Sequence, residues 1–352
     1  MTDSARLRVG IVGCGFFAPN HVHAWAHMPD IAIAGLCDTR IERARAMAER
    51  IGRDIPVFAD LGEMIEQARP DFLDLVTSPE THAPLVHFAA ERRMPAIVQK
   101  PMAFDLATAR GMVEAMEKAG LPFMVHENFR FEAPIAAVGE IVRSGEIGRP
   151  VYAHIAFRTG HDIYAGQPYL ATVKRFILAD VGVHVLDVAR FLMGEAVRVQ
   201  CETQSVKPGL AGEDMATCLL RHASGAISVI ECSYASKLAD DPFPETMITV
   251  EGTEGAVALS RGNEIAVKSG ATIRRFNATP PVLPWAAPPW HVVQDSVLRC
   301  NRDWVAHFRA GTEPQTSGRD NLATLALVEA AYQAAASGVA ATPEPVPNRT
   351  HI

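Results

Sequence analysis

The stretch Leu7-Arg8-Val9-Gly10-Ile11-Val12-Gly13-Cys14-Gly15-Phe16-Phe17-Ala18 decides the fold of this chain. An apolar, β-branched run ends in a G-x-G-x-x-A motif that opens a helical segment. In such a turn the first glycine permits a tight bend, the second lets a pyrophosphate approach the backbone, and the small third residue lets the helix pack on the strand. We therefore predict a dinucleotide site that includes Gly13, Gly15, Phe16 and Phe17. A glycine turn without a ligand is the alternative.

A carboxylate after the second apolar run supports this interpretation. The run Ile31–Cys37 leads into Asp38, twenty residues after Ala18. A carboxylate at this position accepts hydrogen bonds from the adenosine ribose and repels a 2′-phosphate, which favours NAD over NADP. Arg40 lies two residues further on and could bind such a phosphate. The alternative role for Asp38 is the N-cap of the following helix.

The first 127 residues alternate short apolar runs with segments of helical period. We expect strands at Leu7–Val12, Ile31–Cys37, Pro56–Phe58, Phe72–Val76, Ala96–Val98 and Phe123–Val125, and helices at Arg40–Ile51, Leu61–Ala68, His82–Arg93 and Leu106–Ala119. This alternation is typical of an α/β Rossmann fold, a doubly wound parallel sheet with helices on both faces. Residues 1–127 are therefore predicted to form a dinucleotide-binding domain.

Residues 128–352 have a different pattern. Apolar runs follow one another through turns such as His222-Ala223-Ser224-Gly225, which predicts an α+β domain with a large, mostly antiparallel open sheet. Strands are expected at Val151–Phe157, Val197–Val206, Met215–Arg221, Ala226–Ala235, Met247–Glu251, Ala256–Leu259 and Glu264–Val267, and helices at Ile135–Ser144, Asp180–Met193, Val293–Ala310 and Asn321–Ala336. We expect this domain to bind substrate and to mediate oligomerisation.

Composition excludes several classes of protein. The chain has 352 residues, of which 48% are apolar and 21% charged, and its formal net charge is −7. These values are typical of a folded globular protein, and no basic stripe indicates a nucleic-acid partner. No apolar run is long enough to cross a membrane, and the start does not resemble a signal peptide. Six cysteines without a C-x-x-C pair indicate reduced thiols and a cytoplasmic protein.

Three histidines near the glycine motif have spacings that also occur in metal sites. His21, His23 and His27 have no cysteine or carboxylate partner nearby in the sequence, so we expect no metal. We expect their side chains on the helix surface or facing the cofactor.

Polar residues follow three of the expected strands at the edge where open α/β sheets bind ligands. The segments are Thr77-Ser78-Pro79-Glu80-Thr81-His82, Gln99-Lys100-Pro101 and His126-Glu127-Asn128. Further cofactor contacts are therefore expected from Ser78, His82, Gln99, Lys100 and Asn128, in addition to Asp38 and Arg40. Ser78 or Thr81 could instead cap the next helix.

Lys100 is the strongest catalytic candidate. Only six of the 33 basic residues are lysines. Lysine can be deprotonated in a protein and arginine cannot, so a lysine kept at the end of a buried strand indicates a chemical role. A solvated loop lysine is the alternative.

Asp180 and His184 form a second candidate pair. Their i,i+4 spacing places them on one face of the expected helix, where a carboxylate can orient an imidazole that acts as a general base. Read without Lys100, Asp180 could be an N-cap and His184 a buried structural histidine. Asp187 is interpreted as structural, paired with Arg190 or Arg198.

The G-x-G-x-x-A turn, the x-Lys-Pro turn after the fifth strand and the D-x-x-x-H helix together resemble the Gfo/Idh/MocA oxidoreductases over nearly the whole chain. The resemblance implies oxidation of a sugar or cyclitol hydroxyl by hydride transfer to NAD(P), with Lys100, Asp180 and His184 as the catalytic residues. The family motif is Glu-Lys-Pro, whereas this chain has Gln99-Lys100-Pro101. Loss of the glutamate removes a negative neighbour that would keep the lysine charged.

A narrower resemblance, to the D-apiose-oxidising branch of this family, rests on five segments. They are Gln99-Lys100-Pro101-Met102, His126-Glu127-Asn128-Phe129-Arg130-Phe131, Gly212-Glu213-Asp214, Ser233-Tyr234-Ala235-Ser236 and Phe243-Pro244-Glu245-Thr246. It implies oxidation of the anomeric hydroxyl of a branched pentose to its lactone with NAD. The alternatives are a dehydrogenase of another aldose, polyol or inositol, an NAD-dependent glycosidase, or a non-catalytic NAD-sensing regulator.

On this interpretation His184 removes the proton of the lactol hydroxyl and Lys100 donates a hydrogen bond to the same oxygen, although the two roles could be exchanged. Asp180 would orient His184 or bind a neighbouring hydroxyl. Further contacts with the sugar are expected from Asn128, Arg130, His161 and Gln167. We also expect a homodimer or homotetramer, because an antiparallel sheet with one helix-free face needs cover.

Overall fold

The computed structural model describes residues 6–346, which form two compact units. The first unit contains the chain up to Glu127 together with Val297–Leu322, and the second contains Asn128–Ser296 and the chain from Ala323 onward.

The first unit is built on a six-stranded sheet in the order β3-β2-β1-β4-β5-β6, and every neighbouring pair is parallel. The strands are β1 Leu7–Val12, β2 Ile31–Cys37, β3 Val57–Phe58, β4 Phe72–Leu75, β5 Ala96–Gln99 and β6 Phe123–His126. This order confirms the predicted doubly wound fold, because the chain starts at the centre of the sheet and winds outward in both directions.

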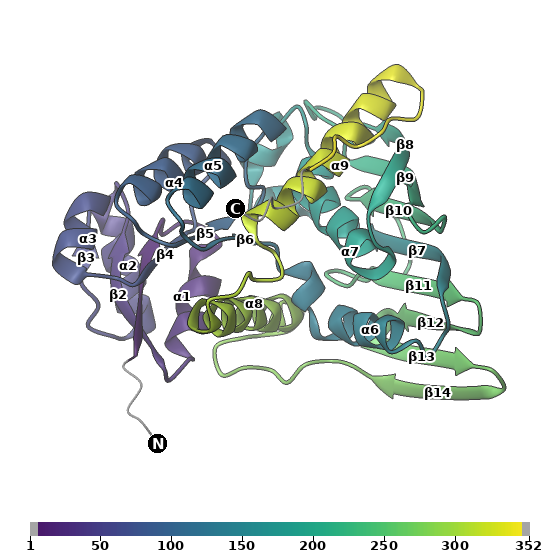
Figure 1. Ribbon diagram of the computed structural model, residues 1–352, viewed down its shortest axis with the longest axis horizontal. Helices are drawn as coiled ribbons and strands as arrows, with labels where there is room; N and C mark the ends of the chain where they lie inside the picture. Colours follow the sequence, from purple (N-terminus) through teal and green to yellow (C-terminus); the bar gives the residue numbers. More distant parts are fainter. Residues whose placement is uncertain (1–5, 347–352) are drawn as a thin grey trace. The chain divides into compact units, whose positions relative to one another are not determined.

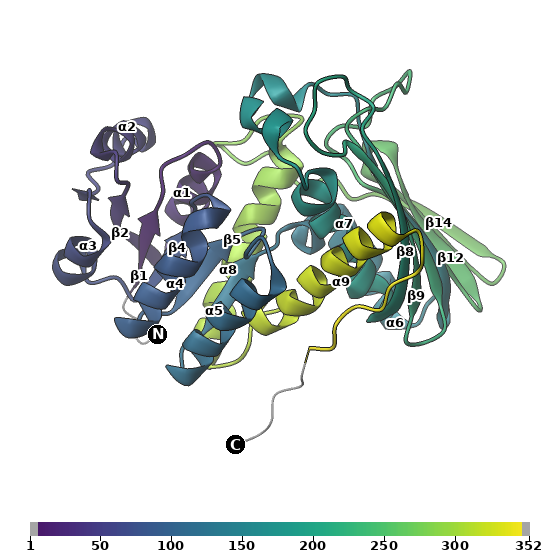
Figure 2. The ribbon, with the colours of Figure 1, turned by 90° about the horizontal axis from the view of Figure 1, so that it is seen from above.

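Helices cover both faces of this sheet (Figures 1 and 2). One face carries α1 Ala18–Ala26, α2 Ile41–Ile51 and part of α8 His291–Ala310, and the other carries α3 Leu61–Ala68, α4 His82–Glu91 and α5 Leu106–Lys118. On the first face the ring of Phe72 lies 5.4 Å from that of Trp25 and 5.5 Å from that of Trp304. All three side chains are fully buried, so aromatic packing joins α1 and α8 to the central strand.

Residues 297–322 belong to the first unit, although a single boundary after residue 127 had been expected. The backbone N–H of Val125 donates to the Thr316 carbonyl at 2.9 Å, and the Thr316 hydroxyl donates to the Val125 carbonyl at 2.8 Å. Met124 and Ser317 form an antiparallel bridge beside them. These bonds satisfy backbone groups on the open edge of β6, which no strand signal in this segment indicated.

The second unit contains an eight-stranded sheet in the order β14-β13-β12-β11-β7-β10-β9-β8. The strands are β7 Pro150–Arg158, β8 Ala196–Gln204, β9 Met215–His222, β10 Ile227–Ser233, β11 Met247–Gly252, β12 Gly255–Ser260, β13 Glu264–Ser269 and β14 Thr272–Asn277. All pairs are antiparallel except β7 with β10, which confirms the predicted, mostly antiparallel sheet. Strand β14 was not among the predicted strands, because its residues are nearly all exposed and lack an alternating apolar pattern.

Helices α6 Ala133–Ser144, α7 Val183–Met193 and the second half of α9 Gly318–Ser337 lie on one face of this sheet (Figure 2). Alternate strand residues point into the resulting core, as in β9, where every second residue is buried. No described helix covers the opposite face. Apolar side chains such as Leu219 and Ile273 are therefore 48% and 60% exposed.

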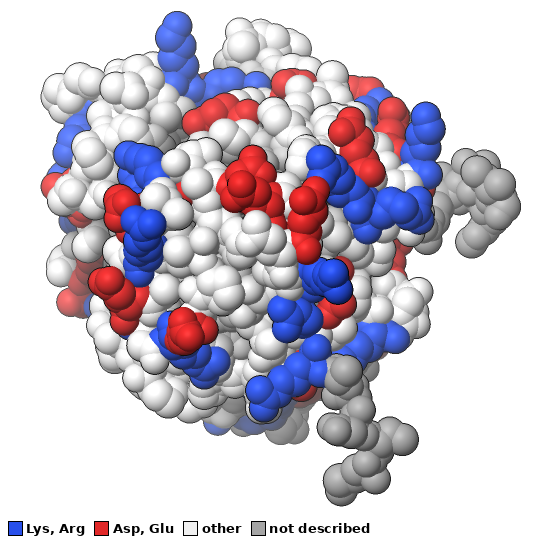
Figure 3. All heavy atoms as spheres, turned by 90° about the vertical axis from the view of Figure 1, so that its left-hand side faces the viewer, with Lys and Arg blue, Asp and Glu red and all other residues white. Residues whose placement is uncertain are grey.

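The surface charge is mixed. Figure 3 shows basic and acidic side chains interspersed over the visible face of the molecule. Among residues 6–346, no helix is both long enough and apolar enough to span a bilayer.

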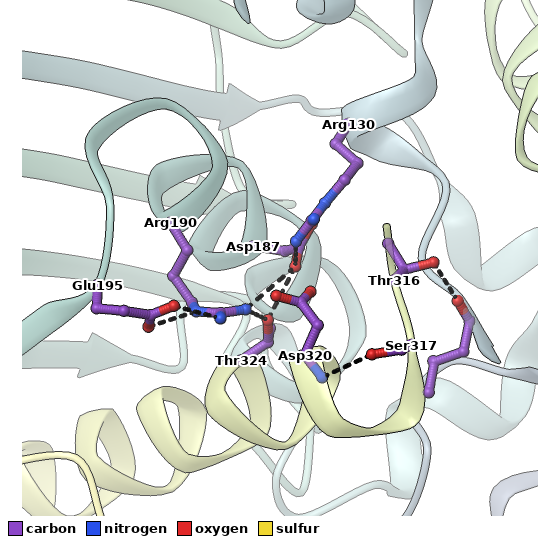
Figure 4. A network of polar contacts seen from close by, with 9 residues as sticks. Arg130, Asp187, Arg190, Glu195, Thr316, Ser317, Asp320 and Thr324 are labelled. Atoms are coloured by element: carbon purple, nitrogen blue, oxygen red, sulfur yellow. Dashed lines mark hydrogen bonds and ion pairs between the residues drawn. The ribbon is translucent and has the colours of Figure 1, made fainter. Parts of the chain in front are cut away.

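A buried ion-pair network holds the start of the second unit to α7 (Figure 4). The Nε atom of Arg130 donates to Asp187 at 2.7 Å, and the side chains of these residues are 7% and 0% exposed. Asp187 also accepts from the Thr324 hydroxyl at 2.8 Å, and Arg190 pairs with Glu195. Burial opposes ionisation of Asp187, but the charge and hydrogen bonds of Arg130 hold the pKa of this carboxyl below its usual value.

Replacing Asp187 with Asn should destabilise the second unit by about 3–5 kcal/mol, because the buried guanidinium of Arg130 loses its counter-ion. Since the folded pKa of Asp187 is depressed, this contribution is present above the ordinary carboxyl pKa and disappears only as the pH falls through the folded value. Urea melts of both proteins at pH 7 measure the difference. The double variant Asp187→Leu with Arg130→Met is the control and should regain part of the loss; equal midpoints for D187N and wild type would contradict this account.

Candidate active site

The glycine turn after β1 has two glycines with different tasks. Gly13 has φ +93°, and a Cβ atom there would lie 2.3 Å from the Val76 carbonyl oxygen, so the turn needs glycine to pass under β4. A Cβ atom at Gly15 would meet no atom of the described residues within 4 Å. Phe16 is 64% exposed, and Phe17 is the residue before α1. The turn therefore leaves open space above its second glycine, as a bound pyrophosphate requires.

Asp38 is held with its carboxylate beside this turn. One oxygen accepts from the Cys14 backbone N–H at 2.9 Å and the other from the Arg40 backbone N–H at 2.9 Å. Helix α2 begins at Ile41 with Arg40 at the N-cap position, so the alternative N-cap role of Asp38 is not realised. Because each oxygen keeps a second lone pair, the carboxylate can still accept hydrogen bonds from a ribose.

The segment after β4 departs from the prediction for His82 and from the alternative capping role of Ser78 or Thr81. Ser78 and Thr81 do not cap α4, since their hydroxyls donate to Glu80 and to the Thr77 hydroxyl. His82, predicted to contact the cofactor, is 0% exposed. Its Nδ1 lies 3.1 Å from the carbonyl oxygens of Pro101 and Met102, and burial lowers its pKa. His82 therefore supports the loop after Lys100 instead of facing a ligand.

The Gln99–Lys100 segment ends β5 with a buried amide and a partly exposed amine. The Lys100 backbone N–H donates to the Gln99 side-chain oxygen at 2.6 Å. The Gln99 amide nitrogen lies 3.1 Å from Nε2 of His21. Gln99 is thus oriented from two sides at once.

Behind Gln99 lies a buried polar cluster that the sequence analysis missed. Asp74 in β4 is 0% exposed and accepts from His21 Nδ1 at 2.8 Å and Trp25 Nε1 at 2.6 Å. His21 was expected on the helix surface or facing the cofactor; it is fully buried, and its ring lies 4.2 Å from that of His126. The available signal was the single charged residue, Asp74, inside the apolar run 72–76, because a buried charge needs hydrogen-bonding partners.

In the second unit, Asp180 lies within the π-helical turn Leu178–Gly182 that precedes α7, so it is not an N-cap. The Tyr234 hydroxyl donates to the Asp180 carboxylate at 2.8 Å. Burial and the charge of Asp180 raise the pKa of Tyr234 well above its usual value, so the phenol stays a donor. Single π-turns frequently occur at functional sites, and Asp180 remains partly exposed. Tyr234 had been noted only as part of a family-like segment.

His184 is packed by the residues that follow β6. Its ring stacks on Phe129 with centroids 4.0 Å apart and an interplanar angle of 3°. Arg130, the next residue, is committed to Asp187, one turn along α7 from His184. Asn128 is 4% exposed and donates to the Ser296 hydroxyl at 2.7 Å. These contacts fix the position of the imidazole, and they account for Arg130 as a structural residue.

His161 and Gln167, the other expected sugar contacts, lie in an irregular segment after β7. His161 is exposed and stacks on Phe243 at 4.1 Å, and the Gln167 oxygen accepts from Tyr169 at 3.1 Å. Glu213 anchors the segment just before Asp180. Its carboxylate accepts from the Phe176 N–H at 3.0 Å and from the Tyr332 hydroxyl at 2.7 Å.

Comparison with known families identifies the class. Residues 7–127 match the oxidoreductase family with an NAD-binding Rossmann fold, and residues 135–258 match the GFO/IDH/MocA C-terminal domain. Fold and turn define an NAD-binding oxidoreductase, and the chain belongs to the Gfo/Idh/MocA family.

Similar proteins span nearly the whole chain. A D-apiose dehydrogenase of Paraburkholderia graminis is 46% identical over 96% of this chain and 90% of that protein. A second one, of Rhizobium rhizogenes, is 43% identical over 96% of this chain and 97% of that protein. The solved structure of an oxidoreductase from Agrobacterium radiobacter in complex with NAD+, L-tartaric acid and magnesium has a TM-score of 0.93 and 42% identity, covering 96% of this chain and 98% of that one.

The two glycines of the turn allow a paired test. Gly13→Ala should lower the melting temperature of the ligand-free protein, since both φ and the 2.3 Å approach to Val76 exclude a side chain. Gly15→Ala should leave that temperature unchanged and weaken NAD+ binding by about 10-fold, or roughly 1.4 kcal/mol. Scanning calorimetry and titration calorimetry measure the two effects. Gly111→Ala, at an open position inside α5, is the control for NAD+ affinity; NAD+ affinity of G15A equal to that of wild type would refute the placement of the cofactor over this turn.

Proposed function

We propose that this NAD-dependent sugar dehydrogenase oxidises the anomeric hydroxyl of D-apiose to the lactone. The observation that carries the proposal is identity of 46% and 43%, over 96% of the chain, to two D-apiose dehydrogenases. Retention of Lys100, Asp180 and His184 supports it, because a binding protein without turnover would have no use for an amine and an imidazole held in this way.

The residues of the first unit fit NAD. Gly13 and Gly15 would admit the pyrophosphate, Phe16 and Phe17 would border it, and Asp38 would accept from the adenosine ribose. Arg40 contributes its backbone N–H to Asp38 and has its side chain exposed. Bound NAD+ supplies the hydride acceptor for the carbon that carries the alcohol.

The chain's own groups handle the proton. In our proposal His184 takes the proton from the anomeric hydroxyl, and Lys100 donates a hydrogen bond to the same oxygen, which stabilises the negative charge that develops there. Asp180, with one oxygen held by Tyr234, accepts from a neighbouring hydroxyl or orients His184. The stacking of Phe129 on His184 keeps the imidazole in one orientation during the transfer.

Sugar specificity is proposed to reside in polar groups of the second unit. Asn128, His161 and Gln167 remain proposed contacts, and Ser78 a proposed cofactor contact at its exposed position. Arg130 is left out of this set, because its guanidinium already binds Asp187.

We further propose that the chain self-associates, as a dimer or tetramer, through the uncovered face of the eight-stranded sheet. Exposed apolar side chains there, such as Leu219, favour burial against a second copy. All six cysteines are free thiols, which supports a cytoplasmic location.

A panel of sugars tests the assignment. D-apiose with NAD+ should give NADH at a higher kcat/KM than other aldoses, polyols or inositol, and NADP+ should replace NAD+ poorly. Lys100→Ala and His184→Ala should each lower kcat by roughly 10²–10⁴-fold while NAD+ affinity is retained. Absorbance at the NADH band measures turnover.

Lys118→Ala, which removes an exposed lysine of the same unit, is the matched control and should behave as wild type. A higher kcat/KM for inositol would replace the substrate, and sugar cleavage without net NADH would indicate a glycosidase. NAD+ binding without turnover of any sugar would indicate a regulator. Near-normal turnover in both alanine variants would defeat the catalytic assignment.

A further inference from the structure

The buried cluster behind Lys100 connects the centre of the parallel sheet to the proposed catalytic amine. Starting from Asp74, hydrogen bonds pass through His21 to the Gln99 amide and from there to the Lys100 backbone N–H, at 2.8, 3.1 and 2.6 Å. Asp74, His21 and Gln99 are 0%, 0% and 8% exposed, so water does not compete for these bonds. This series of hydrogen bonds connects three elements, β4, α1 and β5.

The direction of each hydrogen bond follows from one donor that cannot change. The Lys100 backbone N–H can only donate, so the oxygen of the Gln99 amide faces it and the amide NH₂ faces His21. An NH₂ group needs an acceptor, so Nε2 of His21 carries no proton. The proton of the neutral ring is then on Nδ1, where it donates to the Asp74 carboxylate.

We propose that Asp74 and His21 are positioning residues for Lys100: the carboxylate holds the imidazole as its Nδ1–H tautomer, the imidazole holds the Gln99 amide, and the amide fixes the backbone of Lys100. The proposal rests on the catalytic role proposed for Lys100. A displacement of about 1 Å at a reacting group can lower a rate by roughly 10²-fold, so this fixation matters for catalysis.

Glutamine at position 99 and neutral His21 require each other. An imidazolium would carry a proton on Nε2 and point it at the NH₂ group of Gln99, where no acceptor exists. A glutamate at position 99 would accept at that point and would therefore require the imidazolium. The departure from the Glu-Lys-Pro motif thus sets the protonation state of a buried histidine on a neighbouring element, His21 on α1.

Two other titratable groups face His21 among the described residues. Asp74, on β4, accepts hydrogen bonds from His21 and Trp25, and these donors favour its ionised form. His126, on β6, has its pKa lowered to about 3, chiefly by burial, so it stays neutral near pH 7. Its Nε2 lies 3.2 Å from the Asn301 oxygen.

Nitrogen NMR on the ¹⁵N-histidine-labelled, ligand-free protein tests the tautomer directly. Wild type should show His21 with Nδ1 protonated and Nε2 unprotonated from pH 6 to 9, and Gln99→Glu should show both nitrogens protonated at pH 6. Loss of the signal in His21→Gln assigns it. An Nε2–H tautomer or an imidazolium in the wild type would overturn the proposal.

Kinetics test the positioning role. Gln99→Glu should lower kcat about 10-fold or more at pH 9 and recover as the pH falls toward 6, because the imidazolium then supplies the missing donor. Gln67→Glu, the same charge change on the exposed surface of α3, should show the wild-type pH profile. A Gln99→Glu profile parallel to that of wild type would contradict the proposal.

A pair of uncharged variants tests the acceptor alone. His21→Gln can still accept from the Gln99 amide and should keep kcat within about 3-fold, whereas His21→Met, similar in length but unable to accept well, should lose about 10-fold or more. Equal rates in the two variants would count against the relay, meaning the series of hydrogen bonds from Asp74 through His21 and Gln99 to the Lys100 backbone. If either variant fails to fold, the NMR comparison of wild type and Gln99→Glu still decides.

Failure of this proposal differs from failure of the proposed function. If NMR shows the predicted tautomers but Lys100→Ala turns over normally, the relay is a structural device and the lysine has no catalytic role. If NMR shows the wrong tautomer but Lys100→Ala is inactive, the lysine is catalytic and the relay does not exist.

Discussion

A buried carboxylate in the middle of the parallel sheet is the constraint on which the first unit depends. Asp74 has no exposed surface, so only protein donors can stabilise its charge, and Trp25 and His21 both donate to one of its oxygens, Oδ2. These donors place α1 against β4, and the same helix begins at the glycine turn that passes close to Val76, just after the end of β4. The cofactor turn and the segment that carries Lys100 are thus held by one set of contacts.

The second unit also contains a buried carboxylate, Asp187, that protein donors hold in place. The Arg130–Asp187 pair ties the residues after β6 to α7, and Phe129, the residue before Arg130, stacks on His184. Asp180 lies in the π-turn before α7, and its carboxylate accepts from the Tyr234 hydroxyl. In both units, then, a buried carboxylate held by protein donors belongs to the contacts around the side chain that is proposed to react.

Much of this architecture could be predicted from the sequence because local signals are strong there. The glycine turn, the strand–helix alternation and Asp38 each carry their own pattern, and the structure has a parallel sheet with the expected turn. The return of residues 297–322 to the first sheet could not be predicted, because that contact depends on one threonine pairing with a distant edge strand. His82 and His21 were misplaced for a similar reason: polarity at a strand end or on a helix does not show which side faces the interior.

The central claim is that Lys100 and His184 act on one hydroxyl oxygen in one step. A double-mutant cycle on kcat/KM, with Lys100→Ala, His184→Ala and the double variant, measures this most directly, because groups that act as a unit are strongly non-additive. The account predicts that the double variant loses little more activity than the worse single variant. Losses that multiply would show that the two side chains work independently, and would contradict it.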